Sequence, residues 1–445
     1  MYYKLIINFS LLLLILFPKN EIFAQDTLQE PMQEIIISYQ AKQRTPITFQ
    51  NITTSEIKLK FTGQEPSFLL SETPSITAYS DAGNTQGYSY FRMRGIDQTR
   101  INVTLDGVPL NEPEDQGAYF SNYPDLFNSI SKVQIQRGVG TSKNGAASYA
   151  GSIELFSPNL GNPEKTTVGM GYGSFNSLRV FVDYNSGIKN KKAIYVRASQ
   201  IYSDGYKYNS SNNSQSVYLS SGLFLNNSTW KFNFLGGHQQ NELAWLGVPE
   251  NLIDKDRRTN VNENEKDEFT QGILQAINKW QLRINWTVEN SIYYTFLKGN
   301  YDFNLNTFLG MPGNEELYNY AFQSNLFGFF STYSYSKNSL NWITGFHGNI
   351  YTRKHTGSEI NFGKLYENTG YKNEVSIFSK LDYTTGAFTI FADLQLRHSS
   401  FEYEGAVELE KMNWNFINPK AGLTFAASAQ TNRRKKKRSL FILTI

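Results

Sequence analysis

The chain has 445 residues, no cysteine and a formal net charge of +3. The absence of cysteine excludes disulfides, thiolate metal sites and a catalytic cysteine together. Six positive charges lie in one run, Arg433–Arg438, and removing these six from +3 leaves −3, so the overall charge does not predict a nucleic-acid partner.

The N-terminal segment Met1–Ala24 has the pattern of a secretory signal peptide. Lys4 gives a short basic start, and Leu5–Phe17 is an apolar run. Ile22–Ala24 precede the expected cleavage site before Gln25. A membrane-spanning helix needs about 20 apolar residues, so this run is too short, and an N-terminal anchor is the alternative. No other apolar run has that length. The sequence therefore predicts export without a membrane-spanning helix.

Residues 25–44 predict a polar segment that contains one apolar, β-prone run, Gln33–Tyr39. A run of this kind near a mature N-terminus can pair with an edge strand of another chain. The alternative is that it forms the first strand of the domain that follows.

Residues 45–160 predict a small domain of mixed helices and strands. Ser67–Leu70 lies between two prolines and predicts a short helical turn. Ile101–Leu105 and Lys132–Arg137 predict strands, because β-branched residues alternate with polar ones in both.

Four sequence blocks in this domain are more specific than its elements. A single Arg-Gly or Asp-Gly pair predicts only a turn, where glycine supplies a positive φ. Here the blocks occur in a fixed order: Phe91–Asp97, Val103–Pro109, Val133–Gly140 and Asn144–Leu155. In order and spacing they resemble the plug domain of TonB-dependent outer-membrane receptors, and the resemblance covers roughly residues 33–425. Gln134 stands where that family usually has an acidic residue, and Val139 where it often has proline.

The resemblance implies roles for three sets of residues. The segment before the plug would hold the TonB box, which pairs with the periplasmic energising protein; the candidates are Glu34, Ile35, Ile36, Ile37 and Ser38. The plug fold would depend on charged residues and turn glycines, namely Arg92, Arg94, Gly95, Asp106, Gly107, Arg137, Gly138, Gly145, Gly151 and Glu154. The loop Asn111–Phe120 would face a ligand through Glu112, Glu114, Asp115, Gln116 and Tyr119.

Two expectations concern these plug residues. The charged ones should hold the plug fold, or the plug against the barrel wall, through charge-assisted hydrogen bonds. Arg94→Ala should therefore reduce the amount of folded receptor before it changes ligand choice. For the loop Asn111–Phe120, a solvated acidic turn is the alternative to ligand contact.

From about Thr166 onward, apolar and polar residues alternate. On one face of a predicted strand lie Phe388, Ile390, Ala392, Leu394 and Leu396, and on the other lie Thr389, Asp393, Gln395 and Arg397. Ala193–Gln200, Trp230–Phe234 and Leu282–Val288 alternate likewise. The aromatic fraction of 15% and strand lengths near the ~9–11 residues of a membrane strand favour a transmembrane barrel over a soluble β-sandwich.

The predicted fold class is therefore mainly β. A mixed α/β plug domain precedes antiparallel transmembrane β-barrel strands in residues 161–425. The connections have unequal lengths: Gln239–Gln271 predicts a long polar loop, in which Trp245 and Pro249 indicate some order, and Asn185–Lys192 predicts a short turn. Long extracellular loops and short periplasmic turns are typical of such barrels.

The predicted barrel is incomplete. About a dozen alternating segments precede Phe425, whereas plugged outer-membrane transporters have about 22 strands. Trp414–Phe425 still alternates, and residues 426–445 predict a basic tail outside the barrel. We expect a C-terminally truncated receptor whose open edge leaves backbone groups unpaired in lipid and prevents stable insertion. Completion by another subunit is the alternative.

The sequence predicts no catalytic chemistry. Its histidines, His238, His347, His355 and His398, lack metal-ligand spacing, and its serines lack a nucleophile-elbow pattern. We therefore expect no enzyme, no metal site and no cofactor.

The function implied by the resemblance is energised uptake of a scarce ligand, most commonly a ferric siderophore or iron citrate. The expected location is the bacterial outer membrane, and the expected partners are the TonB complex, membrane lipid and the barrel-insertion machinery, with no nucleic acid. A non-transporting surface receptor or adhesin is one alternative, and a truncated, non-functional receptor fragment is another.

Overall fold

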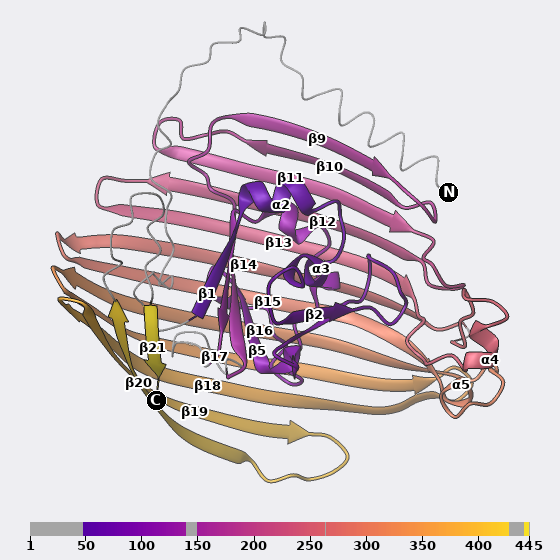
Figure 1. The fold of residues 1–445 in the computed structure, drawn as a ribbon. Coiled ribbons are helices and arrows are strands. Elements are labelled where there is room, and N and C mark those ends of the chain that lie inside the picture. Colours follow the sequence, from indigo (N-terminus) through magenta and orange to yellow (C-terminus); the bar gives the residue numbers. More distant parts are fainter. Residues whose placement is uncertain (1–47, 139–148, 263, 427–439, 445) are drawn as a thin grey trace, which may run out of the picture. The chain divides into compact units, whose positions relative to one another are not determined.

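The computed structural model describes residues 48–138, 149–262, 264–426 and 440–444 (Figure 1). The signal-peptide prediction, the TonB-box candidates Glu34–Ser38 and the plug glycine Gly145 lie outside these residues. Two parts follow one another along the described chain: a small N-terminal domain, drawn in indigo and purple, and a large sheet of long strands.

The N-terminal domain is built from short elements in two sheets. A five-stranded sheet has the order β1-β7-β8-β5-β6, and a three-stranded sheet has the order β2-β3-β4. The elements are β1 Thr48–Thr53, α2 Thr54–Lys60, α3 Pro66–Leu70, β2 Ile76–Tyr79, β3 Tyr90–Met93, β4 Ile96–Asp97, β5 Ile101–Leu105, β6 Val108–Pro109, β7 Lys132–Arg137 and β8 Gly151–Phe156, with 3-10 turns at Gln98–Arg100, Phe120–Asn122 and Leu126–Ser129. The predicted helical turn and the two predicted strands are confirmed as α3, β5 and β7.

Local sequence explains where the first helix of this domain begins. The side chain of Thr53 accepts a hydrogen bond from the backbone N–H of Glu56, and the Glu56 carboxylate accepts one from the Thr53 backbone N–H at 2.7 Å. This reciprocal capping box satisfies two backbone donors that the first turn leaves unpaired. The chain therefore changes from strand to helix at Thr53.

The centre of the N-terminal domain is fully enclosed. Every residue of β5 and β8 is buried, although polar and apolar residues alternate in both strands. β5 and β8 run parallel, and β8 pairs antiparallel with β7. A Cβ added at Gly151 would lie 2.6 Å from the carbonyl oxygen of Gln136 and would overlap the sulfur of Met93, so only glycine fits there.

Glu65 precedes α3 and is buried inside this domain, with 8% of its surface exposed. Its Oε2 has no hydrogen-bond partner within the described part of the chain, and burial raises the pKa of its carboxyl well above the usual range. The folded domain therefore favours protonated Glu65. The free energy of unfolding is highest at acidic pH and falls as the pH rises through the raised pKa of Glu65.

We expect Glu65→Gln, which stays neutral, to raise the melting temperature by ~2–4 °C at about pH 8 and to match the parent protein near pH 4. Thermal unfolding followed by near-ultraviolet circular dichroism at both pH values measures this. A stability difference that does not change with pH would show that Glu65 is not the titrating group.

The second part is one antiparallel sheet in which neighbours in sequence are neighbours in space. Its order runs from β9 to β21 without a crossover. The strands are β9 Lys165–Tyr172, β10 Leu178–Asn185, β11 Lys192–Ser203, β12 Asn212–Phe224, β13 Ser228–Glu242, β14 Lys266–Arg283, β15 Trp286–Asn304, β16 Leu317–Lys337, β17 Leu340–Glu359, β18 Gly363–Thr385, β19 Phe388–Glu404, β20 Met412–Ala426 and β21 Leu440–Thr444. Within the described residues β9 and β21 do not pair with each other, so this sheet is not closed. The predicted fold class is confirmed.

The two faces of these strands differ in chemistry, as their alternation predicts. In β19 the apolar side chains Phe388, Ile390 and Leu394 are 44–51% exposed, whereas Asp393 and Gln395 are buried. The same division holds in β11 and β13. The polar side chains thus lie on the inner, buried face of the sheet, and the apolar side chains lie on its outer, exposed face. Apolar faces of this width are rare on proteins surrounded by water and indicate contact with lipid.

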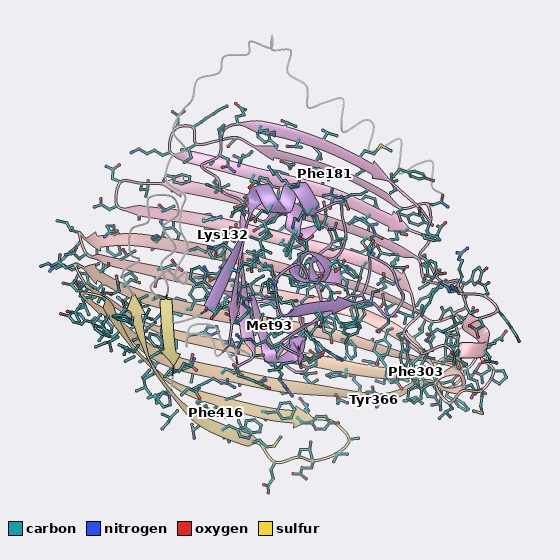
Figure 2. All side chains as sticks on the ribbon, in the orientation of Figure 1. Met93, Lys132, Phe181, Phe303, Tyr366 and Phe416 are labelled. Atoms are coloured by element: carbon teal, nitrogen blue, oxygen red, sulfur yellow. The ribbon has the colours of Figure 1, made fainter. Side chains whose placement is uncertain are left out.

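The ends of the strands are also unequal. One end carries the connections 204–211, 243–265, 305–316 and 405–411, and includes the short helices α4 Glu250–Ile253 and α5 Leu305–Phe308. The labelled side chains Phe303 and Tyr366 lie at this end (Figure 2). The other end has tight turns, such as those at 284–285, 338–339 and 386–387. Of the helices in the described ranges, none has the length and apolar character to span a bilayer.

Two sequence predictions are corrected here. Leu282–Val288 is not one strand, because Ile284 and Asn285 form the turn between β14 and β15, and Ile284 is 96% exposed. The predicted loop Gln239–Gln271 is shorter, since β13 continues to Glu242 and β14 begins at Lys266. Strands of 15 and 18 residues exceed the ~9–11 needed to cross a bilayer, so their ends lie beyond the apolar band and lose its pattern.

Within the predicted basic tail, Leu440–Thr444 forms β21 and pairs antiparallel with β20. This part of the tail therefore lies in the sheet, contrary to the prediction. An apolar run that meets an unpaired strand edge readily adds to it. Residues 427–439, which include the basic run, lie outside the described residues.

Candidate ligand-binding site

The loop Asn111–Phe120 joins β6 to the 3-10 turn Phe120–Asn122 of the N-terminal domain. The Asn111 side chain holds its base: its Oδ1 accepts from the Val103 N–H at 2.7 Å, and its Nδ2 donates to the Ile101 carbonyl at 3.0 Å. Higher in the loop, the Gly117 N–H donates to Asp115 Oδ1 at 2.7 Å, and the Glu112 N–H donates to the Gly117 carbonyl at 2.8 Å. The loop is therefore a folded unit with its own internal bonds.

Glu112 joins this loop to the large sheet. Its carboxylate forms a short ion pair with Arg353 of β17 and accepts from Gln271 Nε2 of β14 at 2.6 Å. The side chains of Glu112 and Arg353 are both buried, with 6–7% of their surface exposed. Burial raises the pKa of Glu112, and the Arg353 guanidinium acts in the opposite direction.

Glu114 makes a second link to β17. Its Oε2 lies 2.9 Å from His355 Nε2 and 3.5 Å from Arg353 Nη1. The other side of the loop is bonded to β18, where Lys372 Nζ donates to the Pro113 carbonyl at 2.6 Å. Glu112 and Glu114 are thus held against strands, whereas Asp115 is exposed and its bonds among the described residues lie within the loop, so the predicted alternative of a solvated acidic turn describes Asp115 alone.

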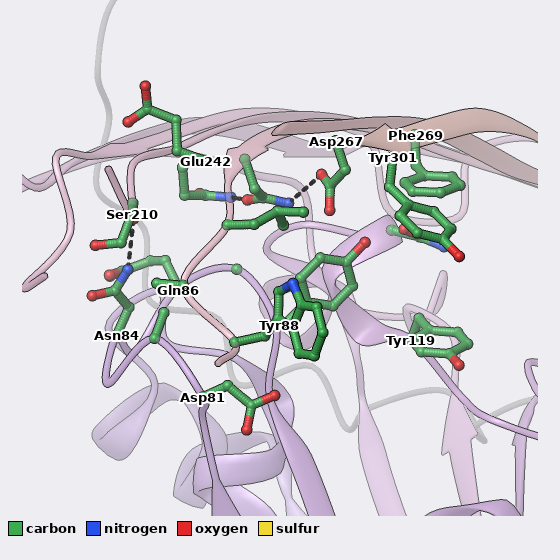
Figure 3. Close-up of a pocket in the computed structure, with 18 of the residues that line it drawn as sticks. Asp81, Asn84, Gln86, Tyr88, Tyr119, Ser210, Glu242, Asp267, Phe269 and Tyr301 are labelled. Carbon is green, nitrogen blue, oxygen red and sulfur yellow. Dashed lines mark hydrogen bonds between the residues drawn. The ribbon is translucent and has the colours of Figure 1, made fainter. Parts of the chain in front are cut away.

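A cavity of about 280 Å³ lies beside this loop, between the N-terminal domain and the long strands (Figure 3). The residues that the N-terminal domain contributes to its lining are Asp81, Ala82, Asn84, Gln86, Gly87, Tyr88, Tyr90, Glu112, Asp115, Tyr119 and Asn122. The strands and their connections contribute Ser210, Ser211, Asn212, Asn241, Glu242, Leu243, Ala244, Trp245, Asp267, Phe269, Leu297, Tyr301, Phe322 and Arg353. It lies at the end of the sheet that has the long connections.

Sequence reasoning anticipated part of this lining. Of the candidate ligand residues, Glu112, Asp115 and Tyr119 line the cavity. Glu114 instead lines a neighbouring cavity of about 770 Å³ with His355 and Lys372. Gln116 turns back into the loop, where its backbone has φ +64° and its Nε2 donates to the Pro113 carbonyl at 2.7 Å.

Aromatic rings and buried polar bonds give the cavity its walls. Tyr88 and Tyr119 of the N-terminal domain meet edge to face with centroids 6.5 Å apart, and Tyr119 donates to Asp115 Oδ2 at 2.9 Å. Across the cavity Tyr301 lies 5.9 Å from the ring of Phe322. Burial raises the pKa of the Tyr88 and Tyr119 hydroxyls above the ordinary tyrosine value, so both remain neutral donors.

Asp106, one of the predicted structural residues, contacts the wall directly. Its Oδ1 accepts from the Ser157 N–H at 3.1 Å and its Oδ2 accepts from Asn233 Nδ2 of β13 at 3.2 Å, with Lys231 Nζ 3.9 Å away. Its neighbour Gly107 has φ +83°, and a Cβ there would lie 3.0 Å from Phe330 of β16.

The other predicted structural residues lie inside the domain or on its surface. Arg137 Nη1 donates to the Pro74 carbonyl at 3.1 Å. The Arg92 guanidinium lies over the Tyr79 ring, 5.4 Å from its centroid. Arg94 is exposed, and its backbone is left-handed with φ +54°. Gly95 and Gly138 also have positive φ. Glu154 is buried in β8, opposite Thr104 and Gln134.

The most deeply buried contact to the wall was not predicted. Asp125, in the turn before Leu126–Ser129, accepts from Arg179 Nε of β10 at 2.9 Å and from Arg197 Nη1 of β11 at 3.1 Å. The side chains of Asp125 and Arg197 are fully buried. Arg197 also donates to the Asp125 carbonyl at 2.8 Å. The sequence signal for this site was the pair of arginines at polar positions of two alternating strands.

A small mixed domain seated against the polar face of long antiparallel strands, with an apolar face outside, defines a plugged β-barrel type of membrane protein. Residues 41–152 match the family described as TonB-dependent Receptor Plug Domain. Residues 41–152 therefore form a plug domain of this family, and the long antiparallel strands that follow form a barrel-type wall against it. We refer to the N-terminal domain from here on as the plug.

Solved structures have the same fold at low sequence identity. The unliganded ferric citrate transporter FecA matches with a TM-score of 0.72 and 12% identity, over 87% of this chain and 61% of FecA. The ferric-catecholate import receptor Fiu from E. coli K12 has a TM-score of 0.69 and 14% identity, over 86% of this chain and 68% of Fiu. The ferric yersiniabactin uptake receptor FyuA from Yersinia pestis has a TM-score of 0.68 and 14% identity, over 86% of this chain and 62% of FyuA.

The chain thus spans between 61% and 68% of the length of these three structures. No curated protein matches it in sequence.

Proposed function

We propose that the protein is an outer-membrane receptor for TonB-dependent uptake of a scarce ligand. The observation that supports this most strongly is the cavity at the plug apex, which is closed on one side by the folded loop Asn111–Phe120 and on the other by β12 to β17. A concave site with many aromatic rings and a few convergent polar groups is the usual form of a small-ligand site.

The cargo that we propose is a ferric chelate. The three solved structures of this fold named above bear the names of receptors or transporters for ferric citrate, ferric catecholate and ferric yersiniabactin. In this proposal the ligand lies against Tyr88, Tyr119 and the strand residues opposite them. The plug blocks the inner face until it rearranges. No covalent step is involved.

The partners follow from the two ends of this process. The exposed apolar face of the strands would contact outer-membrane lipid after the barrel-insertion machinery has placed it there. The energising partner would be the TonB complex, bound at Glu34–Ser38 by addition of this β-prone run to a strand edge. That run lies only about ten residues before β1, so tension on it would reach the plug directly.

The test of energised uptake uses Ile36→Pro in the candidate TonB box. Proline removes a backbone N–H that strand addition needs, so we expect about a tenfold or greater loss of uptake while ligand binding at the cell surface is unchanged. Accumulation of iron-55 chelates is measured in iron-starved cells with and without a functional TonB complex.

The matched control is Gln29→Pro, which places the same residue in the polar part of the same segment. If the Ile36→Pro and Gln29→Pro variants take up the chelate equally well, Glu34–Ser38 is not the TonB box. If uptake by the parent protein does not depend on TonB, the proposed function is wrong.

A further inference from the structure

The cavity at the plug apex has an unequal balance of charge. Asp81, Glu112 and Asp115 of the plug and Glu242 and Asp267 of the strands line it, whereas Arg353 is the one cation in its lining. In Figure 3 Asp81 lies on the plug side, and Glu242 and Asp267 lie on the strand side. Carboxyl groups therefore lie on both sides of the cavity. Burial raises the pKa of Asp267 to about 7, so Asp81, Asp115 and Glu242 supply most of the negative charge that Arg353 does not balance.

The single cation is already engaged. Arg353 forms its ion pairs with Glu112 and Glu114 of the plug loop, so it is not positioned as a receptor for an incoming anion. Two lysines outside the lining offset part of the negative charge: Lys207 Nζ donates to the Asp81 carbonyl at 3.0 Å, and Lys266 Nζ lies 4.0 Å from Glu242. Lys207 is turned toward backbone carbonyls, since it also donates to that of Ala244 at 3.4 Å.

The remaining lining adds negative potential of another kind. Aromatic rings line the cavity, among them those of Tyr88, Tyr119, Trp245, Phe269, Tyr301 and Phe322. The faces of aromatic rings carry the negative part of their quadrupole and attract cations. A site with walls of low polarity and charges of one sign concentrates ligands of the opposite sign.

We propose that this cavity selects a ligand with a net positive charge, whose ammonium or guanidinium group enters between the carboxylates and the rings, and that it disfavours anionic chelates such as ferric citrate. This inference rests on the proposed function and narrows its ligand class. Within ferric chelates it separates cationic hydroxamates from the anionic citrate and catecholate complexes.

The test compares three iron chelates and one iron-free cation by isothermal titration calorimetry on the protein in detergent. Ferrioxamine B carries a free ammonium group, N-acetyl-ferrioxamine B is the same chelate without that charge, and ferric citrate is anionic; spermidine is the iron-free cation. We expect ferrioxamine B to bind at least about tenfold more tightly than its N-acetylated form and ferric citrate to bind most weakly, because the site favours positive charge.

The variant that tests the site is Asp81→Asn combined with Glu242→Gln, which removes two charges from opposite sides of the cavity. We expect it to reduce the preference for ferrioxamine B over the N-acetylated chelate at least about threefold. Glu250→Gln is the matched control, since Glu250 is exposed on α4 in the adjoining connection and does not line the cavity. It should leave the preference unchanged.

Equal binding of ferrioxamine B and its N-acetylated form, tighter binding of ferric citrate, or no binding of any cationic probe would each overturn the inference. If spermidine binds, binds more weakly to the double variant, and no iron chelate binds, the inference is supported but the proposed iron cargo is wrong. Binding of ferrioxamine B without TonB-dependent accumulation would likewise leave the inference standing and contradict energised uptake alone.

Discussion

Asp125→Ala is expected to destabilise the attachment of the plug to the strands by about 3–5 kcal/mol. Asp125 is the carboxylate shared by Arg179 of β10 and Arg197 of β11, and its side chain is fully buried. Removing it leaves two guanidinium groups, one of them completely enclosed, without their counter-charge. Buried charges that lose their partner are among the most costly changes in a folded protein.

The same argument predicts a rescue. Replacing all three residues together, by Asp125→Leu, Arg179→Met and Arg197→Met, removes every charge and should restore most of the lost stability. Urea unfolding and limited proteolysis of the plug in detergent measure both effects. Lys189→Met is the control, because its ion pair with Glu164 is exposed and should contribute little. If Asp125→Ala resists protease as well as the parent protein does, the anchor is not needed to hold the plug.

Arg353→Ala is expected to release the loop Asn111–Phe120 from β17 and to speed its hydrogen exchange by about a hundredfold, equivalent to ~3 kcal/mol. Arg353 compensates the buried carboxylate of Glu112 and also pairs with Glu114. Without it, Gln271 is the one strand residue among those that the structure describes that still donates a hydrogen bond to the buried carboxylate of Glu112.

This defect should depend on pH. Burial already raises the pKa of Glu112, and loss of Arg353 removes the group that opposes this rise. In Arg353→Ala the loop should therefore be ordered at acidic pH, where Glu112 is protonated, and should open as the pH rises through the raised pKa. Hydrogen–deuterium exchange at about pH 5 and about pH 8, corrected for intrinsic rates, measures the change.

Two further variants separate charge from bulk at this contact. Adding Glu112→Gln to Arg353→Ala should abolish the pH dependence, because no carboxylate is left to titrate. Lys354→Ala, at the next position of β17, removes an exposed cation that pairs with Glu367 and should leave the loop unchanged. An Arg353→Ala loop that exchanges equally fast at both pH values would contradict this account.

Alternation was a reliable guide wherever one face of a strand meets an apolar surface and the other does not. It placed β19 correctly because Ile390 and Leu394 remain outside while Asp393 and Gln395 remain inside. It failed at Leu282–Val288, where the pattern continues across the turn at Ile284 and Asn285. Periodicity does not reveal a turn when the turn residues happen to fit the period.

The plug motifs predicted their own turns well, but not their partners. Arg94, Asp106 and Gly138 have the positive φ that tight turns require. By contrast, Glu112 is separated from Arg353 by 241 residues, and Asp125 from Arg197 by 72. Nothing local in the sequence specifies which arginine of a long strand meets which plug carboxylate, because that depends on the stagger of every strand between them.

The same limit applies to the cavity. Asp115 and Tyr119 could be proposed because they occur in a polar, Pro/Gly-bounded loop of the plug. Glu242 and Asp267 were assigned to the ends of one long loop, and only the continuation of β13 and β14 brings them to the cavity wall. The charge of the site therefore becomes visible only in three dimensions.

β1 is one of the two edge strands of the five-stranded plug sheet, and it precedes every other described element along the chain. Within that sheet it pairs with β7, through Thr48 to Thr53. A tension that enters from the N-terminal side therefore loads this single ladder first, while Asp125 and Glu112 lie further along the chain and remain bonded to the strands. Under such a tension we expect β1 to leave the sheet while Asp125 and Glu112 still hold the rest of the plug to the strands.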